Sequence, residues 1–100
     1  MHIIEWEFLP ASGRKAEFLA AYGPDGVWTK LFRRSEGFLG TELIALSDQP
    51  GWYQTTDRWS SEAAYLAFRQ SFAADYEALD LACESLTVLE RPVKHGSKNI

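Results

Sequence analysis

The residues best suited to chemistry lie on one face of a predicted strand near the middle of the chain. Residues 52–59 alternate in character, and Asp57 and Trp59 fall on the same face as Tyr53 and Thr55. If that face turns toward helices, burial raises the pKa of the carboxyl unless a hydrogen bond or an ion pair compensates. Asp57 is then a candidate proton acceptor, or a structural group that hydrogen-bonds the backbone or a hydroxyl. A register shift of one residue would turn this carboxyl to the other face.

Other reactive residue types form no recognisable site. The serines lack the context of a nucleophile elbow, and only His2 and His95 could serve as their base. Cys83 is the only cysteine, so an internal disulfide and a cysteine metal cluster are excluded, and we expect it to pack as a small apolar residue. Neither histidine has a second metal ligand at a useful spacing. We therefore predict no metal site and no catalytic triad.

Composition and charge narrow the classes of function. The 100 residues are 46% hydrophobic, 24% charged and 14% aromatic, which is typical of a single globular domain. Ten basic and fourteen acidic residues give a net charge of −4, so we expect no binding to nucleic acid or to an acidic membrane. No stretch resembles a signal peptide or a transmembrane helix. Because a lone cysteine also suits a reducing compartment, we predict a cytoplasmic location.

The hydrophobic pattern predicts the order strand, helix, strand, strand, helix, strand. Strands are expected at residues 2–9, 38–47, 52–59 and 85–92. The first helical element is expected in two pieces separated at residues 23–26, and the second as one continuous helix capped by Ser60 or Ser61. This order predicts an α+β, ferredoxin-like βαββαβ fold, a four-stranded antiparallel sheet with its helices on one face. We expect one domain over residues 1–93 and a flexible C-terminal tail at 94–100.

The two faces of the predicted sheet differ in character. Trp6 and Phe8 would lie under the helices, whereas Phe38, Ile44 and Trp52 would lie on the opposite face among charged side chains. A face this apolar marks a partner, so we predict a homodimer formed by sheet-to-sheet packing. The alternative is a monomer whose open sheet face is solvated.

Two segments resemble a known family. Residues 37–43 read Gly-Phe-Leu-Gly-Thr-Glu-Leu, and residues 57–65 read Asp-Arg-Trp-Ser-Ser-Glu-Ala-Ala-Tyr. Both are similar to the antibiotic biosynthesis monooxygenase-like proteins of the dimeric α/β-barrel superfamily, and the resemblance spans Ile3 to Glu90. It implies a homodimeric barrel with a pocket between sheet and helices in each subunit. It also implies oxygenation of electron-rich aromatic compounds, such as polyketide phenols, without a metal or flavin cofactor.

The resemblance also gives expectations for single residues. Trp59 matches the tryptophan that this family often places at the end of the third strand, where it lines the pocket. We take Asp57 and Trp59 as the catalytic candidates. By position, the expected ligand-pocket residues are Trp6, Tyr22, Trp28, Tyr65 and Phe68. Relatives that degrade heme use an Asn on the first strand and a His on the second helix. Since neither is present here, we do not expect that activity.

Two functions from different classes stay open at this point. The first is a cofactor-independent monooxygenase-like protein that binds a hydrophobic aromatic or polyketide-like small molecule. The second is a non-catalytic homodimer that binds or sequesters a small ligand, or serves a stress response, on the same scaffold. Both predict a dimer, and only the first predicts turnover.

Overall fold

The computed structural model describes residues 1–93, and the predicted tail at 94–100 lies outside the described residues. The strands are β1 (His2–Pro10), β2 (Phe38–Ala45), β3 (Tyr53–Trp59) and β4 (Thr87–Pro92). The helices are α1 (Lys15–Tyr22), α2 (Val27–Phe32), α3 (Glu62–Ser71) and α4 (Ala73–Cys83), followed by a 3-10 turn at Glu84–Leu86. All neighbouring strands are antiparallel, in the order β2-β3-β1-β4. The predicted ferredoxin-like βαββαβ fold is confirmed.

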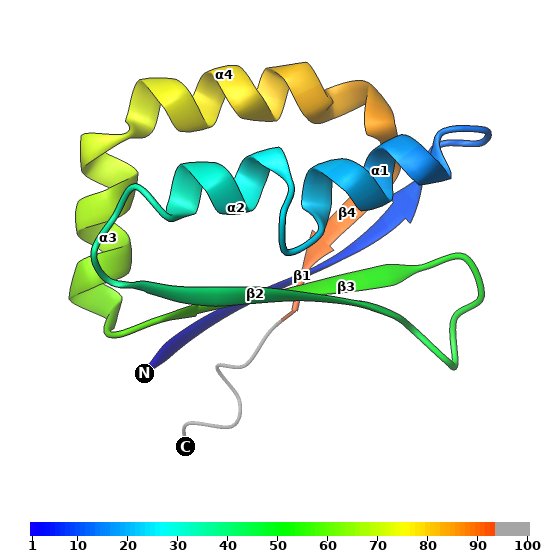
Figure 1. Ribbon diagram of the computed structural model, residues 1–100. Helices are drawn as coiled ribbons and strands as arrows, with labels where there is room; N and C mark the ends of the chain where they lie inside the picture. The colour runs from blue at the N-terminus through cyan, green and yellow to red at the C-terminus, as the bar shows by residue number, and fades with distance from the viewer. Residues whose placement is uncertain (94–100) are drawn as a thin grey trace.

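All four helices cover one face of the sheet, and no described element covers the other face (Figure 1). The alternation of side chains along β1 and β3 explains this arrangement, because large aromatic residues such as Trp6, Phe8 and Trp59 all fall on the same face of the sheet. Phe8 and Trp59 point toward the helices and pack with Phe18 and Phe68. Phe18 is 0% exposed, and Trp59 and Phe68 are each 1% exposed. The core therefore lies between the sheet and the helices.

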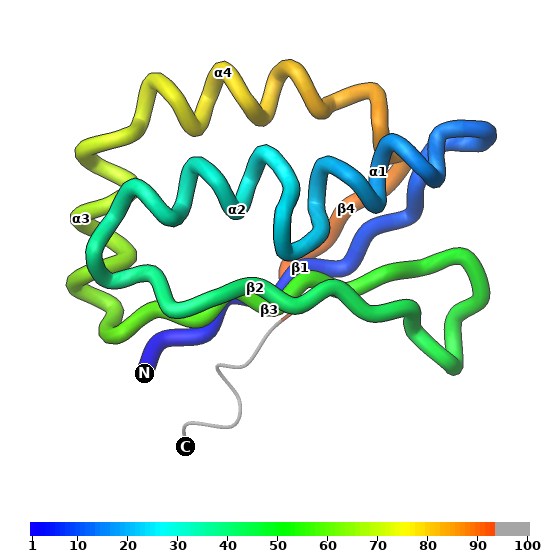
Figure 2. Tube along the Cα trace, viewed as in Figure 1, coloured from blue at the N-terminus to red at the C-terminus, as the bar shows by residue number. Residues whose placement is uncertain are grey.

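The first helical element is divided in two, as predicted. Gly23 to Gly26 separate α1 from α2, and the Cα trace dips toward the sheet between them (Figure 2). A Cβ on Gly26 would lie 2.2 Å from the carbonyl oxygen of Ala21, so the close turn requires glycine there. The Thr29 hydroxyl donates to the Gly23 carbonyl oxygen at 3.1 Å and closes the turn. Both helices can then bury one side against the sheet.

The prediction of one continuous second helix is wrong. Phe72 leaves helical geometry, with φ −114° and ψ 25°, and the chain turns sharply there from α3 into α4 (Figures 1 and 2). The ring of Phe72 stacks on that of Phe68, with 5.4 Å between the centroids. The guanidinium of Arg34 lies over the same ring, 4.8 Å from its centroid. The turn directs α3 onto Trp59 and α4 onto α2, which a straight helix could not do. The predicted cap is confirmed, because the Ser61 hydroxyl accepts the Ala64 N–H at 3.0 Å.

The predicted bulge at Gly40 is confirmed, and it corrects the placement of Phe38. The register of β2 against β3 shifts between Phe38 and Gly40, where Gly40 has φ +154°. The extra residue turns Phe38 inward, where its ring lies 5.2 Å from Trp59 and 5.4 Å from Phe32. Phe38 is therefore a core residue, whereas the sequence pattern placed it on the open face.

Candidate functional site

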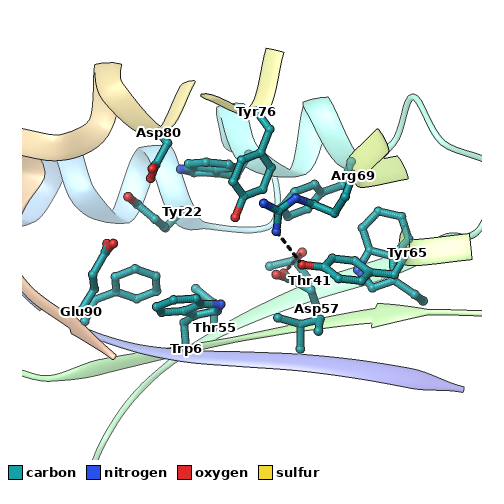
Figure 3. Close-up of a pocket in the computed structure, with 15 residues that line it drawn as sticks. Trp6, Tyr22, Thr41, Thr55, Asp57, Tyr65, Arg69, Tyr76, Asp80 and Glu90 are labelled. Carbon is teal, nitrogen blue, oxygen red and sulfur yellow. Dashed lines mark hydrogen bonds between the residues drawn. The ribbon is translucent and has the colours of Figure 1, made fainter. Parts of the chain in front are cut away.

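A cavity of about 290 Å³ lies between the sheet and the helices (Figure 3). Its floor comes from β1 and β3, and its walls come from all four helices, β2 and β4. The walls combine aromatic rings with a few polar groups, which is the usual character of a small-molecule site. The space under the helices is therefore not filled by the core aromatics.

The structure brings most of the predicted site residues to this cavity. Asp57 and Trp59 line it, and so do the predicted pocket residues Trp6, Tyr22, Trp28 and Tyr65. Phe68 does not line it, in contrast to the prediction. At the centre of α3, Phe68 packs between Trp59 and Phe32 at centroid distances of 5.0 and 5.4 Å, so its ring supports the cavity wall from behind.

Asp57 lies at one end of the cavity on the inner face of β3. It pairs across the sheet with Thr41, whose hydroxyl donates to Asp57 Oδ1 at 2.7 Å. Burial raises the pKa of Asp57 to about 6, while the Thr41 hydrogen bond opposes that rise. A carboxyl with such a pKa exchanges its proton near neutral pH, as a general base must. Both interpretations of Asp57 from the sequence thus hold in part: it bonds a hydroxyl and it lines a cavity.

Trp59 lines the same cavity and carries a buried polar atom that is unsatisfied. Its ring is held by Phe38, Phe32 and Phe68, and only 1% of the residue is exposed. The buried indole N–H has no hydrogen-bond partner within residues 1–93. Because a buried donor without an acceptor costs free energy, this N–H is suited to an acceptor on a bound molecule.

A cationic group that the sequence reasoning missed lies at the same end of the cavity as Asp57. Arg69 donates from Nη1 to the Tyr65 hydroxyl at 2.9 Å, and its guanidinium lies 4.0 Å from the centroid of the Tyr76 ring (Figure 3). Burial raises the pKa of Tyr76, and the charge of Arg69 opposes that rise. Arg69 takes part in no ion pair with the described carboxylates. The spacing of four residues between Tyr65 and Arg69 was the available signal.

Two further carboxyl groups lie at the opposite end of the cavity. Asp80 of α4 and Glu90 of β4 stand near Tyr22, away from Asp57 and Arg69 (Figure 3). Burial raises the pKa of Glu90, and the nearby charge of Asp80 adds to the rise. Burial also raises the pKa of the Tyr22 hydroxyl. The cavity thus has the cation Arg69 at one end and the carboxyl groups of Asp80 and Glu90 at the other. We call this second end the acidic mouth.

No group of three or more His, Cys, Asp or Glu side chains in residues 1–93 is arranged to hold a metal ion. None of the helices in that range combines the length and the apolar character that crossing a lipid bilayer requires.

Comparison with known proteins adds structural relatives. No protein-family model and no curated protein sequence matches the chain. A solved structure of a proposed antibiotic biosynthesis monooxygenase from Bordetella bronchiseptica is similar, with a TM-score of 0.66, 23% identity, and coverage of 93% of this chain and 94% of that one. A second, from Deinococcus radiodurans, has a TM-score of 0.60 and 20% identity, covering 95% of this chain and 93% of that one.

A third similar structure is a mutant of SnoaB, a cofactor-independent oxygenase from Streptomyces nogalater. Its TM-score is 0.60 at 17% identity, and the match covers 94% of this chain and 91% of that one. At these identities the likeness is one of fold. It agrees with the resemblance carried by residues 37–43 and 57–65, and the chain has the antibiotic biosynthesis monooxygenase-like fold.

Proposed function

We propose that this protein binds an electron-rich aromatic small molecule in the cavity between sheet and helices and oxygenates it with dioxygen, without a metal or flavin. The observation that supports the proposal is the position of the Asp57 carboxyl on an aromatic-lined wall, where burial raises its pKa to about 6 and so suits it to act as a base. The likeness of fold to a cofactor-independent oxygenase supports it as an analogy.

The proposed reaction begins with proton removal. Asp57 takes a proton from an activated CH₂ group that lies between two aromatic rings and opposite a ketone in the same central ring, as in anthrone. The product is a delocalised carbanion with negative charge on the carbonyl oxygen. The carbanion adds dioxygen to form a peroxide at the same carbon. Loss of water then gives a carbonyl, so that CH₂ and O₂ become C=O and H₂O. The substrate carbon is oxidised, and dioxygen is the oxidant.

Two groups at the same end of the cavity are suited to hold the anion. The free indole N–H of Trp59 can donate to the substrate oxygen, and Arg69 supplies a positive charge beside the Tyr65 hydroxyl. Donors that are already positioned where charge develops stabilise a transition state at little reorganisation cost. The surrounding rings limit water, which would otherwise weaken these interactions.

We also propose that two copies pair through the open face of the sheet. That face exposes Ile3, Ile44 and Leu89, which are 40%, 51% and 55% exposed. The charged side chains around these residues form hydrogen bonds and ion pairs between neighbouring strands. One example is the ion pair of Arg58 with Glu42 at 2.5 Å. Apolar side chains set among internally paired charges suit packing against a second copy.

Oxygen uptake with anthrone tests the catalytic proposal. We expect uptake above the protein-free blank, and a loss of about 100-fold or more in Asp57→Asn, because the amide cannot accept the proton. Asp48→Asn, in the exposed turn between β2 and β3, is the matched control and should leave uptake unchanged. Anthrone binding by calorimetry without any uptake would contradict catalysis and favour the non-catalytic ligand-binding alternative.

A further inference from the structure

The two carboxylates of the acidic mouth are not held in ion pairs, although the charge of Arg69, farther along the cavity, acts on Asp80. Asp80 and Glu90 take part in no ion pair and no side-chain hydrogen bond among the residues that the structure describes. Glu7 on the open face differs, because Arg91 binds it at 2.6 Å. Burial raises the pKa of Glu90, and the charge of Asp80 adds to the rise, because the two mouth carboxylates repel each other. This repulsion is relieved when a cation binds between them.

A second hollow continues the mouth outward. It has a volume of about 530 Å³, lies between α4 and β4, and shares Tyr22, Asp80 and Glu90 with the cavity. Glu77 and Glu84 add two more carboxylates to its wall, and no Lys or Arg of residues 1–93 lines it. A ligand entering by this route therefore meets four carboxylates before it reaches the aromatic rings. Such a path favours positively charged molecules and disfavours anions.

Aromatic rings stand directly behind these carboxylates. Tyr22 packs on Phe8 at 4.8 Å and on Trp28 at 6.0 Å, and Trp6 lies below it on the cavity floor (Figure 3). A ring face next to a carboxylate is a favourable site for an ammonium group, which gains from the ring quadrupole and from the charge together. Tyr22 thus joins the acidic mouth to the apolar interior.

The unsatisfied Trp59 N–H is an independent sign that the same cavity takes a ligand. Trp59 is 1% exposed, and it lines the same cavity as Asp80 and Glu90. The indole N–H needs an acceptor such as an oxygen atom, whereas the two carboxylates of the acidic mouth favour a cation. One molecule meets both demands if its oxygen and its positive charge are separated by an aromatic body.

We infer that the preferred ligand is a fused-ring phenol or ketone that carries a basic amine, with its oxygen toward Trp59 and its ammonium group between Asp80 and Glu90. This inference rests on the proposed function, because it specifies the substrate class of the same cavity. It adds a charge requirement that the oxygenation chemistry does not itself impose.

Calorimetry with matched probes tests the inference. The probes are 6-(2-aminoethyl)-2-naphthol and the neutral 6-(2-hydroxyethyl)-2-naphthol, which differ only in the terminal group. At low salt we expect the amine to bind about fivefold tighter or more, as a partly exposed site with two carboxylates and a ring allows. The preference should shrink as salt is added, because the carboxylates are solvent-accessible.

Removing the two mouth charges should abolish the preference. In the double variant Asp80→Asn/Glu90→Gln, we expect the amine to bind no tighter than the alcohol, while the affinity of the alcohol stays within about twofold of wild type. The matched control is Glu36→Gln/Asp48→Asn, which removes two exposed charges away from the cavity and should keep the full preference. A near-native melting temperature shows that each variant is folded.

The outcomes separate the two proposals. If both probes bind wild type equally, or if the preference survives in Asp80→Asn/Glu90→Gln, the amine inference is overturned while the aromatic-pocket proposal stands. If neither probe binds wild type, the proposed function fails together with the inference. A preference lost only in the mouth variant supports both.

Discussion

The polar side chains on the two faces of the sheet differ in how completely they are hydrogen-bonded. On the open face the polar groups pair with one another: Glu5 accepts from Gln54 and from Thr56 at 3.1 and 2.9 Å, and Glu42 binds Arg58. On the helix-covered face within residues 1–93, the Asp57 carboxyl accepts one side-chain hydrogen bond, at 2.7 Å, and the Trp59 indole N–H finds no acceptor. The buried face, where incomplete bonding costs most, is the less satisfied one.

This difference indicates on which face of the sheet selection has tolerated a loss of stability. Polar groups on an open face can bond water, so their mutual pairing contributes little and needs no functional explanation. A buried carboxyl with a raised pKa and a buried N–H without an acceptor both lower stability, and both line one cavity. Such a combination is characteristic of a binding site whose polar groups are completed by a ligand. Four predictions test this contrast, from the largest expected effect to the smallest.

The first prediction compares neighbours on β3 that face opposite sides. Trp59→Ala should lower the free energy of unfolding by about 3–5 kcal/mol, because a large buried ring is replaced by a void. Arg58→Ala should lower it by no more than about 1 kcal/mol, since its ion pair with Glu42 is exposed. Urea denaturation measures both values. Similar losses for the two variants would remove the distinction between the faces.

The second prediction concerns the sign of the Asp57 contribution to stability. Burial raises the pKa of folded Asp57 to about 6, above the value of about 3.9 for an unfolded aspartate. Folding is therefore favoured by the bound proton: this stabilisation is complete below about pH 4 and is lost as pH rises through about 6. The loss amounts to about 3 kcal/mol at 1.36 kcal/mol per pKa unit.

Asp57→Asn carries no such loss, because the amide does not ionise. The variant should be more stable than wild type at about pH 7.5, by up to about 3 kcal/mol, and close to wild type at about pH 4. Glu42→Gln, on the open face, should change stability by about 0.5 kcal/mol or less at either pH. Urea denaturation at the two pH values gives the comparison. Destabilisation of Asp57→Asn at about pH 7.5 would show that the ionised carboxyl is structurally required.

The third prediction concerns the proposed dimer through the open face. Light scattering should give twice the 11.3 kDa mass of the chain. Ile44→Arg should weaken association by about tenfold or more, about 1.4 kcal/mol, because it places a charge among exposed apolar side chains. Leu66→Arg is a matched control, since Leu66 is 55% exposed but lies on α3. A monomeric wild type, or equal effects of the two variants, would contradict pairing through the sheet.

The fourth and smallest effect is a change in the pKa of Asp57. The Thr41 hydroxyl donates to the carboxylate and so holds the pKa below the value that burial alone would produce. Thr41→Val keeps the shape of the side chain and should raise the pKa by about half a unit to one unit. A carbon-13 NMR titration of the Asp57 carboxyl measures it. A pKa that stays the same or falls would assign the shift to another contact.

Local patterns predicted the fold well, and the misses have physical causes. The alternation in β1 and β3 placed Trp6, Asp57 and Trp59 on the inner face correctly, because period two leaves few alternatives once one face is apolar. Phe38 was placed on the wrong face although Gly40 was recognised as a bulge, since a bulge reverses the alternation only on one side of itself. Local propensity could not show the turn at Phe72, where the ring makes a tertiary contact with the guanidinium of Arg34.

The candidate site was predictable only in part. The aromatic residues could be assigned to the inner face by spacing, but the groups that give the cavity its polarity come from distant segments. Thr41 meets Asp57 only through the β2–β3 register. Asp80 and Glu90 meet because α4 turns back over the sheet toward β4. Such groups resemble ordinary surface charges until the tertiary fold brings them together.

The pH dependence of oxygen uptake tests the central claim most directly. With anthrone as substrate, kcat/KM of the wild type should rise tenfold per pH unit below the pKa of Asp57 and level off above about pH 6, because only the ionised carboxyl accepts a proton. Asp57→Asn should lose both the activity and this rising limb. A wild-type profile that is flat through about pH 6, or a limb that persists in Asp57→Asn, would contradict the assignment of Asp57 as the base.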